Sequence, residues 1–353
     1  NIANYAELRR KVGKLTSWCD VEIILNMLTN ELAADKDIFA AVAAVMSEVN
    51  GAYSVASVIE GQGLVVFRDP FAIRPLVEGK GMFASESAAL DLVGRGLKGD
   101  VKPGECIILN EGSVERRRLV KEKPRHCMFE YVYFSRPDSI AEGKSIYEIR
   151  IRLGRELAKR FDKDADVVVP VPDTARAAAF GFSMESGIPY REGLIKNRYV
   201  GRTFIMPDQQ TRETAVKFKL NPIKSALKNK KVVIVEDSVV RGTTSRNLIS
   251  LVRSAGAKEV HFAISCPPIR WPCFYGIDMT RKSELFAAHV KDAEKELAKK
   301  IGADSVVYQT IEGLKRAIGL SGLCTACLDG DYPTDVSFLL QKQGKTRRPY
   351  EVE

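Results

Sequence analysis

The sequence lacks three features that would assign it to a class at once: a long hydrophobic run, a secretory leader and an even set of cysteines. No stretch of its 353 residues approaches the ~20 consecutive apolar residues of a membrane-spanning helix. The opening residues, 1–5, form neither a basic-then-apolar leader nor an initiator methionine, and we interpret residue 1 as a cut or processed end. Seven cysteines in a chain of this size do not suggest a disulfide scaffold. We therefore expect a cytoplasmic protein with no membrane partner.

The composition is not that of a disordered or fibrous chain, because 45% of the residues are hydrophobic and 28% are charged. The length leaves room for about two domains. Lysine and arginine total 54 against 45 acidic residues, a net charge of +9, which fits either a solvated basic surface or an anionic partner. The longest basic cluster, Arg116–Arg118 with Lys121 and Lys123, has no interleaved aromatic residues and no nucleic-acid-binding module around it. A small phosphorylated substrate is therefore favoured over nucleic acid.

Two regions with different patterns follow one another along the chain. Up to about residue 125 helical and strand patterns mix, as in an α+β domain. A helix is predicted over 17–33, with Asp20 near its start, and strands are predicted over 52–59, 63–67, 105–110 and 114–119. From about residue 145 helices and strands alternate, beginning with a capping box at Ser145–Glu148. Short apolar strands at 166–170, 231–235 and 260–264 then predict an α/β domain with a mainly parallel sheet, buried on both faces.

The most informative segment is Val232–Thr244, where an apolar strand ends in two adjacent acids and a short loop leads into a helix. The N-terminus of such a helix binds anions through free backbone N–H groups and the helix dipole, and Gly242 allows close approach of the backbone. Glu236 and Asp237 suit ribose hydroxyls or a hydrated Mg²⁺ ion. The glycine spacing matches neither a Walker A loop nor a Rossmann fingerprint. An ordinary acidic turn is the alternative interpretation.

This segment resembles the phosphoribosyl-pyrophosphate (PRPP) signature of type I phosphoribosyltransferases. Lys196–Ile205 is similar to the flexible catalytic loop of the glutamine PRPP amidotransferase family, and Phe134–Asp138 is similar to that family's domain junction. Asp69–Leu76 and Phe83–Ser87 match the family's first domain, so the resemblance covers nearly the whole chain. On these motifs the chain is identified as a member of that family, the amidophosphoribosyltransferases.

The resemblance implies an activity and a domain arrangement. The family displaces pyrophosphate from PRPP with ammonia drawn from glutamine, which gives 5-phosphoribosylamine in the committed step of purine synthesis. It implies an incomplete N-terminal-nucleophile (Ntn) glutaminase-type domain over residues 1–125, a phosphoribosyltransferase domain over 126–320, and a C-terminal tail over 321–353. It further implies a homotetramer and feedback inhibition by purine nucleotides.

The resemblance also assigns site residues. Arg241, Gly242, Thr243, Thr244 and Ser245, preceded by Ser238, would hold the 5′-phosphate of PRPP. Glu236 and Asp237 would hold the ribose hydroxyls and Mg²⁺; the family often has two aspartates there, and Glu236 keeps the charge. Asp173 and Thr174 belong to the pyrophosphate loop, with Thr174 as a third position associated with Mg²⁺. Four residues would close over the diphosphate as the catalytic group: Lys196, Arg198, Tyr199 and Arg202.

The cysteines raise a separate question. The spacing of Cys324 and Cys327 alone fits zinc, an iron–sulfur cluster or redox chemistry equally well. The iron–sulfur branch of the family implies that Cys127 and Cys273 join them as the four ligands of a structural [4Fe–4S] cluster. Four-thiolate zinc stays open, because thiolate ligation suits both metals. The other three cysteines are expected to be core or surface residues: Cys19, Cys106 and Cys266.

One family residue has no counterpart in the sequence. The family's glutaminase half uses an N-terminal cysteine as nucleophile, whereas position 1 here is asparagine. We expect the nucleophile and most of the oxyanion site to lie upstream, and Asp20 to be the contact for the glutamine amine. The chain is then expected to use ammonia and to expose sheet edges in its first domain. Two alternative functions are a non-catalytic PRPP-sensing regulator and a salvage transferase for a purine or pyrimidine base.

Overall fold

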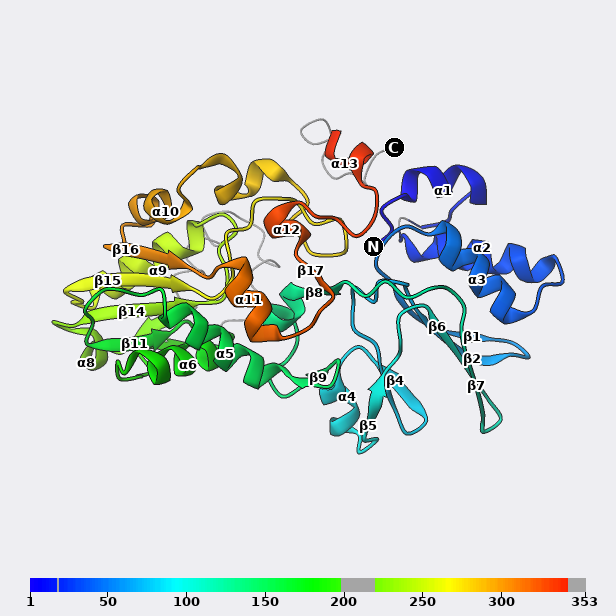
Figure 1. The fold of residues 1–353 in the computed structure, drawn as a ribbon, viewed down its shortest axis with the longest axis horizontal. Coiled ribbons are helices and arrows are strands. Elements are labelled where there is room, and N and C mark those ends of the chain that lie inside the picture. Colours follow the sequence, from blue (N-terminus) through cyan, green and yellow to red (C-terminus); the bar gives the residue numbers. More distant parts are fainter. Residues whose placement is uncertain (18, 198–219, 342–353) are drawn as a thin grey trace.

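The computed structural model describes residues 1–17, 19–197 and 220–341. Figure 1 shows two regions side by side, with β8, β9 and β17 between them. The first region holds α1 to β7, and the second holds the helices and strands from α5 onward. None of the described helices is long and apolar enough to cross a membrane.

The first region stacks three helices on a four-stranded antiparallel sheet of order β1-β2-β6-β7. These elements are α1 (Tyr5–Val12), α2 (Val21–Ala33), α3 (Ile38–Glu48), β1 (Ser54–Ile59), β2 (Gly63–Arg68), β6 (Glu105–Asn110) and β7 (Ser113–Arg118). Along β2 and β6, Val65 and Cys106 face the helices, whereas Val66 and Ile107 pack on the opposite side. The alternation is the period of two that a strand imposes.

A smaller unit lies beside this sheet. The three-stranded sheet β4-β3-β5 consists of β3 (Val77–Gly79), β4 (Met82–Ala84) and β5 (Leu97–Asp100), with α4 (Ser87–Leu92) next to it. All four strands predicted in the first region are found within two residues of their expected bounds. The helix expected from residue 17 begins at Val21, with Asp20 as its N-cap. β1 and β7 are the outer strands of the four-stranded sheet in the part of the chain described here.

The basic cluster on β7 is a solvated, ion-paired strand. Every residue of β7 is exposed. Arg116 pairs with Glu78 at 2.9 Å and with Glu105 at 3.6 Å, and the guanidinium of Arg117 lies 4.2 Å from the Phe39 ring centroid. Arg116 and Arg117 therefore have partners within the molecule. This favours a solvated basic surface over an anionic partner for this part of the net positive charge.

The second region is built on the predicted parallel sheet, of order β11-β14-β15-β16. Its strands are β11 (Val167–Pro170), β14 (Lys231–Glu236), β15 (Glu259–Ile264) and β16 (Ser305–Tyr308). Figure 1 shows α5, α6 and α11 on one side of the sheet and α9 and α10 on the other. Their bounds are α5 (Ile146–Ala158), α6 (Arg176–Ser186), α9 (Thr243–Ser254), α10 (Ala293–Ile301) and α11 (Ile311–Ile318). The Ser145 hydroxyl accepts from the N–H of Glu148, as the capping box predicts.

The chain then returns to the junction between the two regions. β17 (Leu323–Cys324) pairs in parallel with β8 (His126–Cys127), and α12 (Ala326–Asp329) and α13 (Ser337–Gln341) follow. One hydrophobic core includes Ile73 of the first region, Met128 at the junction and Leu323 of the tail. Short elements complete the described chain: a π-helix (Glu130–Phe134), β9 (Ile140–Ala141), β10 (Lys144–Ser145), β12 (Leu194–Lys196), β13 (Leu220–Pro222), α8 (Lys224–Leu227), and 3₁₀ turns at Lys282–Glu284 and Phe286–His289.

The contact between α5 and α6 is backbone against backbone. A Cβ atom added to Gly154 would lie 1.8 Å from the carbonyl oxygen of Ala178, and one added to Gly181 would lie 2.0 Å from that of Ile151. The loop that follows β11 leads directly into α6. The close contact between α5 and α6 therefore helps to hold this loop in position at the end of the sheet.

We predict that Gly154→Ala lowers the free energy of unfolding by about 1–3 kcal/mol, because the helices must separate to admit the methyl group. Denaturant unfolding measures the difference. Met184→Ala is the control, since Met184 lies on α6 with 52% of its surface exposed, and it should change stability by no more than about 0.5 kcal/mol. Equal stability of the two variants would contradict the close-packing interpretation.

Candidate active site

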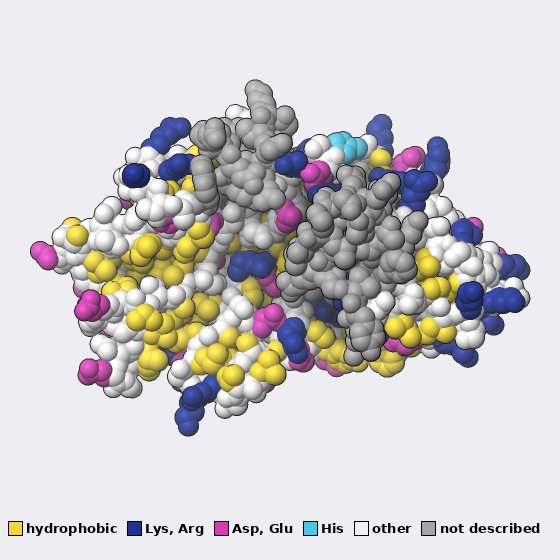
Figure 2. Space-filling view, turned by 180° about the vertical axis from the view of Figure 1, so that it is seen from behind, with side chains coloured by type: hydrophobic (Ala, Val, Ile, Leu, Met, Phe, Trp, Pro, Cys, Tyr) yellow, Lys and Arg dark blue, Asp and Glu magenta, His cyan; other side chains and the backbone are white. Residues whose placement is uncertain are grey.

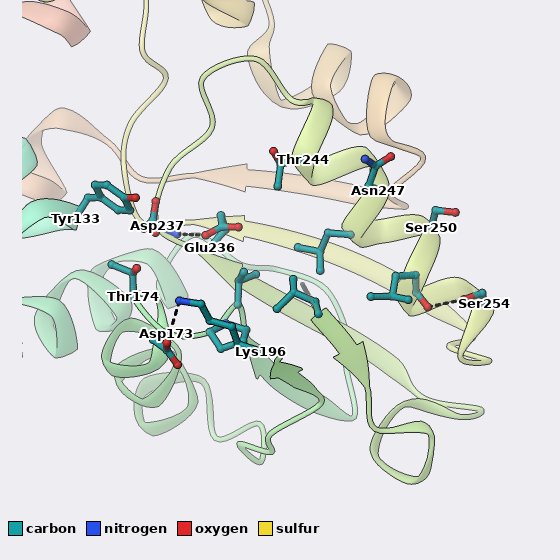
Figure 3. Close-up of a pocket in the computed structure, with 15 residues that line it drawn as sticks. Tyr133, Asp173, Thr174, Lys196, Glu236, Asp237, Thr244, Asn247, Ser250 and Ser254 are labelled. Atoms are coloured by element: carbon teal, nitrogen blue, oxygen red, sulfur yellow. Dashed lines mark hydrogen bonds and ion pairs between the residues drawn. The ribbon is translucent and has the colours of Figure 1, made fainter. Parts of the chain in front are cut away.

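A cavity of about 650 Å³ opens at the carboxyl ends of β11 and β14. Parallel sheets with helices on both sides place their ligands at this edge. The lining residues, many drawn in Figure 3, are Tyr133, Val171, Pro172, Asp173, Thr174, Lys196, Leu220, Glu236, Asp237, Thr244, Asn247, Leu248, Ser250, Leu251 and Ser254. Six of the residues predicted for the site are therefore brought together: Asp173, Thr174, Lys196, Glu236, Asp237 and Thr244.

The loop after β14 carries the acid pair, Glu236 and Asp237. The N–H of Asp237 donates to the Glu236 carboxylate at 3.0 Å, and the Ser238 hydroxyl donates to Asp237 at 2.6 Å. Gly242 adopts the left-handed φ of +79°, which glycine tolerates best, and α9 begins at the next residue. The loop thus brings two carboxylates and a helix N-terminus to one end of the cavity.

Burial opposes ionisation of both acids, and the charge of Asp237 opposes that of Glu236 further. Burial, followed by the charge of Asp237, raises the pKa of Glu236 well above its usual range. Burial also raises the pKa of Asp237 to about 6, against the opposing effects of the Ser238 hydroxyl and the Arg150 charge. A cation or hydroxyl donors bound next to the two carboxylates would stabilise their ionised form. Their chemistry therefore fits a hard divalent cation and a polyhydroxyl ligand.

The loop after β11 supplies the other side of the cavity. Lys196, at the end of β12, lies 3.3 Å from the Asp173 carboxylate, and Arg176 lies 3.6 Å from the same side chain. Figure 3 shows Thr174 and Lys196 on the β11 side of the acid pair and Thr244 on the α9 side. An anion between them would meet a cation on one side and a helix N-terminus on the other.

Several predicted residues stand apart from the lining. Arg241 is exposed and pairs with Glu284, while its carbonyl oxygen accepts from Lys300 at 3.0 Å. Ser238, Gly242, Thr243 and Ser245 flank the cavity in sequence without lining it. Arg198, Tyr199 and Arg202 lie outside the described residues. Asp20 belongs to the first region, where its carboxylate accepts from the N–H of Ile2 at 2.9 Å.

Sequence reasoning missed some lining residues. Asn247 could have been found, because it lies three residues after Thr244 on the same helix face. Tyr133 could not, because it projects from a π-helix, Glu130–Phe134, and a single turn of that kind has no periodic signature. Its neighbour Phe134 was noted only as the start of a junction motif.

The four cysteines predicted as ligands converge at the junction. Cys324 and Cys127 are register partners in the β17–β8 pair. The carbonyl of Cys327 accepts from the N–H groups of Arg270 and Trp271 at 2.9 and 3.0 Å, which brings in the segment of Cys273. All four are buried and free. Burial raises the pKa of Cys127 to about 12. Among the described residues, no three or more His, Cys, Asp or Glu side chains are grouped so that they could hold a metal ion.

The three remaining cysteines are core or surface residues, as expected. Cys19 is exposed, and Cys106 and Cys266 are buried. Cys266 lies beside the acid pair, with its N–H donating to the carbonyl of Asp237 at 2.9 Å.

We predict that Glu236→Gln stabilises the chain in the absence of metal and ligand. The folded-state pKa of Glu236 is raised, so ionisation of this group lowers stability as the pH rises above its unfolded value of about 4.3. The gain should be small near pH 4 and should grow as the pH rises toward 7.5, because the unfolded chain ionises this group readily whereas the folded chain resists its ionisation. Denaturant unfolding in chelator, with Glu185→Gln on the exposed face of α6 as control, measures it. A gain that does not change with pH would contradict the repulsion.

Comparison with known proteins agrees with this arrangement. Residues 138–272 match the model of the phosphoribosyl transferase domain, and residues 1–92 match that of the glutamine amidotransferase domain. The amidophosphoribosyltransferase of Methanocaldococcus jannaschii is 45% identical, over 96% of this chain and 76% of the relative. That of Methanothermobacter thermautotrophicus is 48% identical, over 95% of this chain and 72% of the relative.

Solved structures agree as well. The glutamine PRPP amidotransferase of B. subtilis, complexed with ADP and GMP, superposes with a TM-score of 0.88 at 37% identity, covering 99% of this chain and 78% of that chain. A structure described as the allosteric regulatory enzyme of purine biosynthesis gives 0.88 at 38% identity, covering 95% and 74%. With its two domain matches and its long alignments to close relatives, the chain belongs to the amidophosphoribosyltransferase family of pentosyltransferases.

Proposed function

We propose that residues 1–353 catalyse the displacement of pyrophosphate from C1 of PRPP by ammonia, giving 5-phosphoribosylamine. The nitrogen forms a bond to C1 as the bond from C1 to the diphosphate oxygen breaks, and the diphosphate leaves with its electron pair. The protonated amine then releases one proton to solvent. The observation that carries the proposal is the cavity itself, in which an acid pair lies between a helix N-terminus and Lys196. We assign residues 1–125 to a glutaminase-type domain, 126–320 to the transferase and 321–353 to the tail.

Each end of the cavity suits one part of PRPP. The N-terminal turn of α9, with the Thr244 hydroxyl, offers donors to the 5′-phosphate. Glu236 and Asp237 accept from the ribose hydroxyls. Mg²⁺, when held by Glu236, Asp237 and Thr174, would neutralise charge on the diphosphate.

The leaving diphosphate has its own partners. Lys196 lies at the β11 side of the cavity, next to Asp173, where its ammonium group can stabilise negative charge that grows as the diphosphate departs. Charges placed where the transition state develops charge raise the rate most effectively. Arg198, Tyr199 and Arg202 are proposed to join Lys196 in this role from sequence alone.

The source of nitrogen is a separate part of the proposal. Residue 1 of the sequence is asparagine, and the N-terminal cysteine that the family uses as nucleophile has no counterpart in residues 1–353. We propose ammonia as the nitrogen donor for this polypeptide, with Asp20 as the contact for a glutamine amine when a nucleophile is supplied. A homotetramer is proposed from the family. Purine nucleotides are proposed as inhibitors, since the B. subtilis structure holds ADP and GMP.

We predict that the purified chain releases pyrophosphate from PRPP with Mg²⁺ and an ammonium salt, and not with glutamine. Asp237→Asn should lower the rate by about 100-fold or more, the usual effect of removing one charge-stabilising group, whereas Glu185→Gln should leave it unchanged. A coupled pyrophosphate assay measures both. Turnover with glutamine as the only nitrogen source would contradict the ammonia proposal. PRPP binding without turnover would favour the PRPP-sensing regulator.

We further propose that Cys127, Cys273, Cys324 and Cys327 hold a [4Fe–4S] cluster. The four cysteines are buried and come from three distant segments that meet at the junction, and thiolates are the ligands of such clusters. When bound, the cluster would tie the tail to the junction by covalent links. The chain's own contribution is the β17–β8 pair, which places Cys324 beside Cys127.

We predict a brown protein with about four irons per chain after anaerobic purification. Cys324→Ser should lose the iron and make the tail sensitive to protease, whereas Cys19→Ser, at an exposed position, should keep both properties. Iron and sulfide analysis with an absorbance spectrum measures the outcome. A colourless protein that holds zinc would replace the cluster with a four-thiolate zinc site.

A further inference from the structure

The π-helix Glu130–Phe134 crosses from the junction into the wall of the cavity. It carries Tyr133, which lines the cavity beside the acid pair. Tyr133 is 44% exposed, and its ring packs against Phe129 and Phe134. Its position therefore depends on what fixes the backbone of the π-helix and the rings packed against it.

Arg150 fixes the backbone from the transferase side. This residue lies in the middle of α5 and is only 3% exposed. Its Nε donates to the carbonyl of Tyr131 at 3.0 Å, and its Nη2 donates to the carbonyls of Tyr133 at 3.0 Å and of Ser135 at 2.6 Å. Because the last carbonyls of a single helical turn have no partners within the helix, one guanidinium with donors in a rigid plane can satisfy three carbonyls of this segment together.

Arg74 holds the same segment from the glutaminase side. Its Nη1 lies 2.8 Å from the Glu130 carboxylate, and its guanidinium lies 5.2 Å from the centroid of the Phe134 ring. Glu130, at the start of the π-helix, also accepts from the Ser135 hydroxyl at 2.9 Å. The π-helix is thus held by one arginine from each half of the chain.

The rings transmit these contacts to the cavity. The Tyr133 and Phe134 centroids lie 5.2 Å apart at an interplanar angle of 82°, and both rings lie 5.7 Å from Phe129. A shift of Phe134 under Arg74 therefore moves a direct neighbour of Tyr133. The path from the first region to the cavity wall consists of contiguous contacts.

We propose that Arg150 and Arg74 are positioning residues for PRPP, which act through the π-helix by setting where Tyr133 lies in the cavity. This inference rests on the proposed function, in which the cavity binds PRPP. It makes a residue of the glutaminase half a determinant of substrate affinity in the other half. Neither arginine lines the cavity, so neither is proposed to touch the substrate.

The test compares Arg150→Met, Arg150→Lys and Arg74→Met with Arg152→Met, which is two residues along the same helix. Arg152 donates to the carbonyl of Ala317 at 2.8 Å, a contact remote from the π-helix, and serves as the matched control. Steady-state kinetics with ammonia give KM for PRPP and kcat separately. Near-ultraviolet circular dichroism and thermal unfolding report whether each variant is folded.

We expect Arg150→Met to raise KM for PRPP about tenfold or more, a change larger than its effect on kcat. Arg150→Lys should recover part of the loss, because one ammonium can serve some of the three carbonyls. Arg74→Met should raise KM by a smaller factor. Arg152→Met should match the wild type.

A double-mutant cycle with Tyr133→Ala tests the route. If both arginines act through Tyr133, adding Arg150→Met or Arg74→Met to Tyr133→Ala should raise KM little further, since coupled residues are not additive. Fully additive effects would overturn the proposal, as would a KM for Arg150→Lys and Arg74→Met equal to that of Arg152→Met. If Arg150→Met does not fold, Arg150→Lys and the double-mutant cycle of Arg74→Met with Tyr133→Ala still test the proposal. Wild-type chain that binds no PRPP would instead overturn the proposed function.

Discussion

Two neighbouring carboxylates at the end of a buried strand are the constraint on which the second region depends. Glu236 and Asp237 resist ionisation because burial raises both pKa values, and the charge of Asp237 raises the pKa of Glu236 further. The fold holds them there with the parallel neighbours of β14 and with the helix that starts at Thr243. A site that is costly without its ligand and favourable with it is a common feature of enzymes that bind charged substrates. The positive φ of Gly242 and the N-terminus of α9 then have a shared purpose, since both complete the cradle that the acids begin.

At the junction between the two regions, buried arginines hold irregular backbone in place. Arg68 is 1% exposed and donates to the carbonyls of Arg74, Ala72 and Val101 and to the Glu142 carboxylate, at 2.8–3.1 Å. Arg150 does the same for the π-helix. Irregular backbone cannot satisfy its own carbonyl groups when it is buried, and a guanidinium supplies several donors at once. The two halves therefore meet through polar contacts that are specific in direction, in addition to the shared apolar core.

The sequence predicted the regular part of this architecture and little of the irregular part. The apolar strands at 166–170, 231–235 and 260–264 and the capping box at Ser145 were predicted correctly, because a strand or a helix end leaves a local pattern. The acid pair and Thr244 could be assigned for the same reason. The roles of Tyr133 and Arg150 left no such pattern, since they depend on contacts between segments distant in sequence. The convergence of the four cysteines was expected only from a family resemblance, as spacing within the chain says nothing about Cys127 and Cys273.

The pairing of β17 with β8 has a consequence for the order in which the protein can be made. The chain is synthesised from its N-terminus, and β8 precedes the entire parallel sheet, whereas β17 follows it. The partner of Cys127 therefore leaves the ribosome only after every strand of the second region has been synthesised. During synthesis the β8–β17 pair can therefore form only after the strands of the parallel sheet have been made. Any metal cofactor held by the four thiols would have to be inserted at the end of biogenesis, into a scaffold that is otherwise complete.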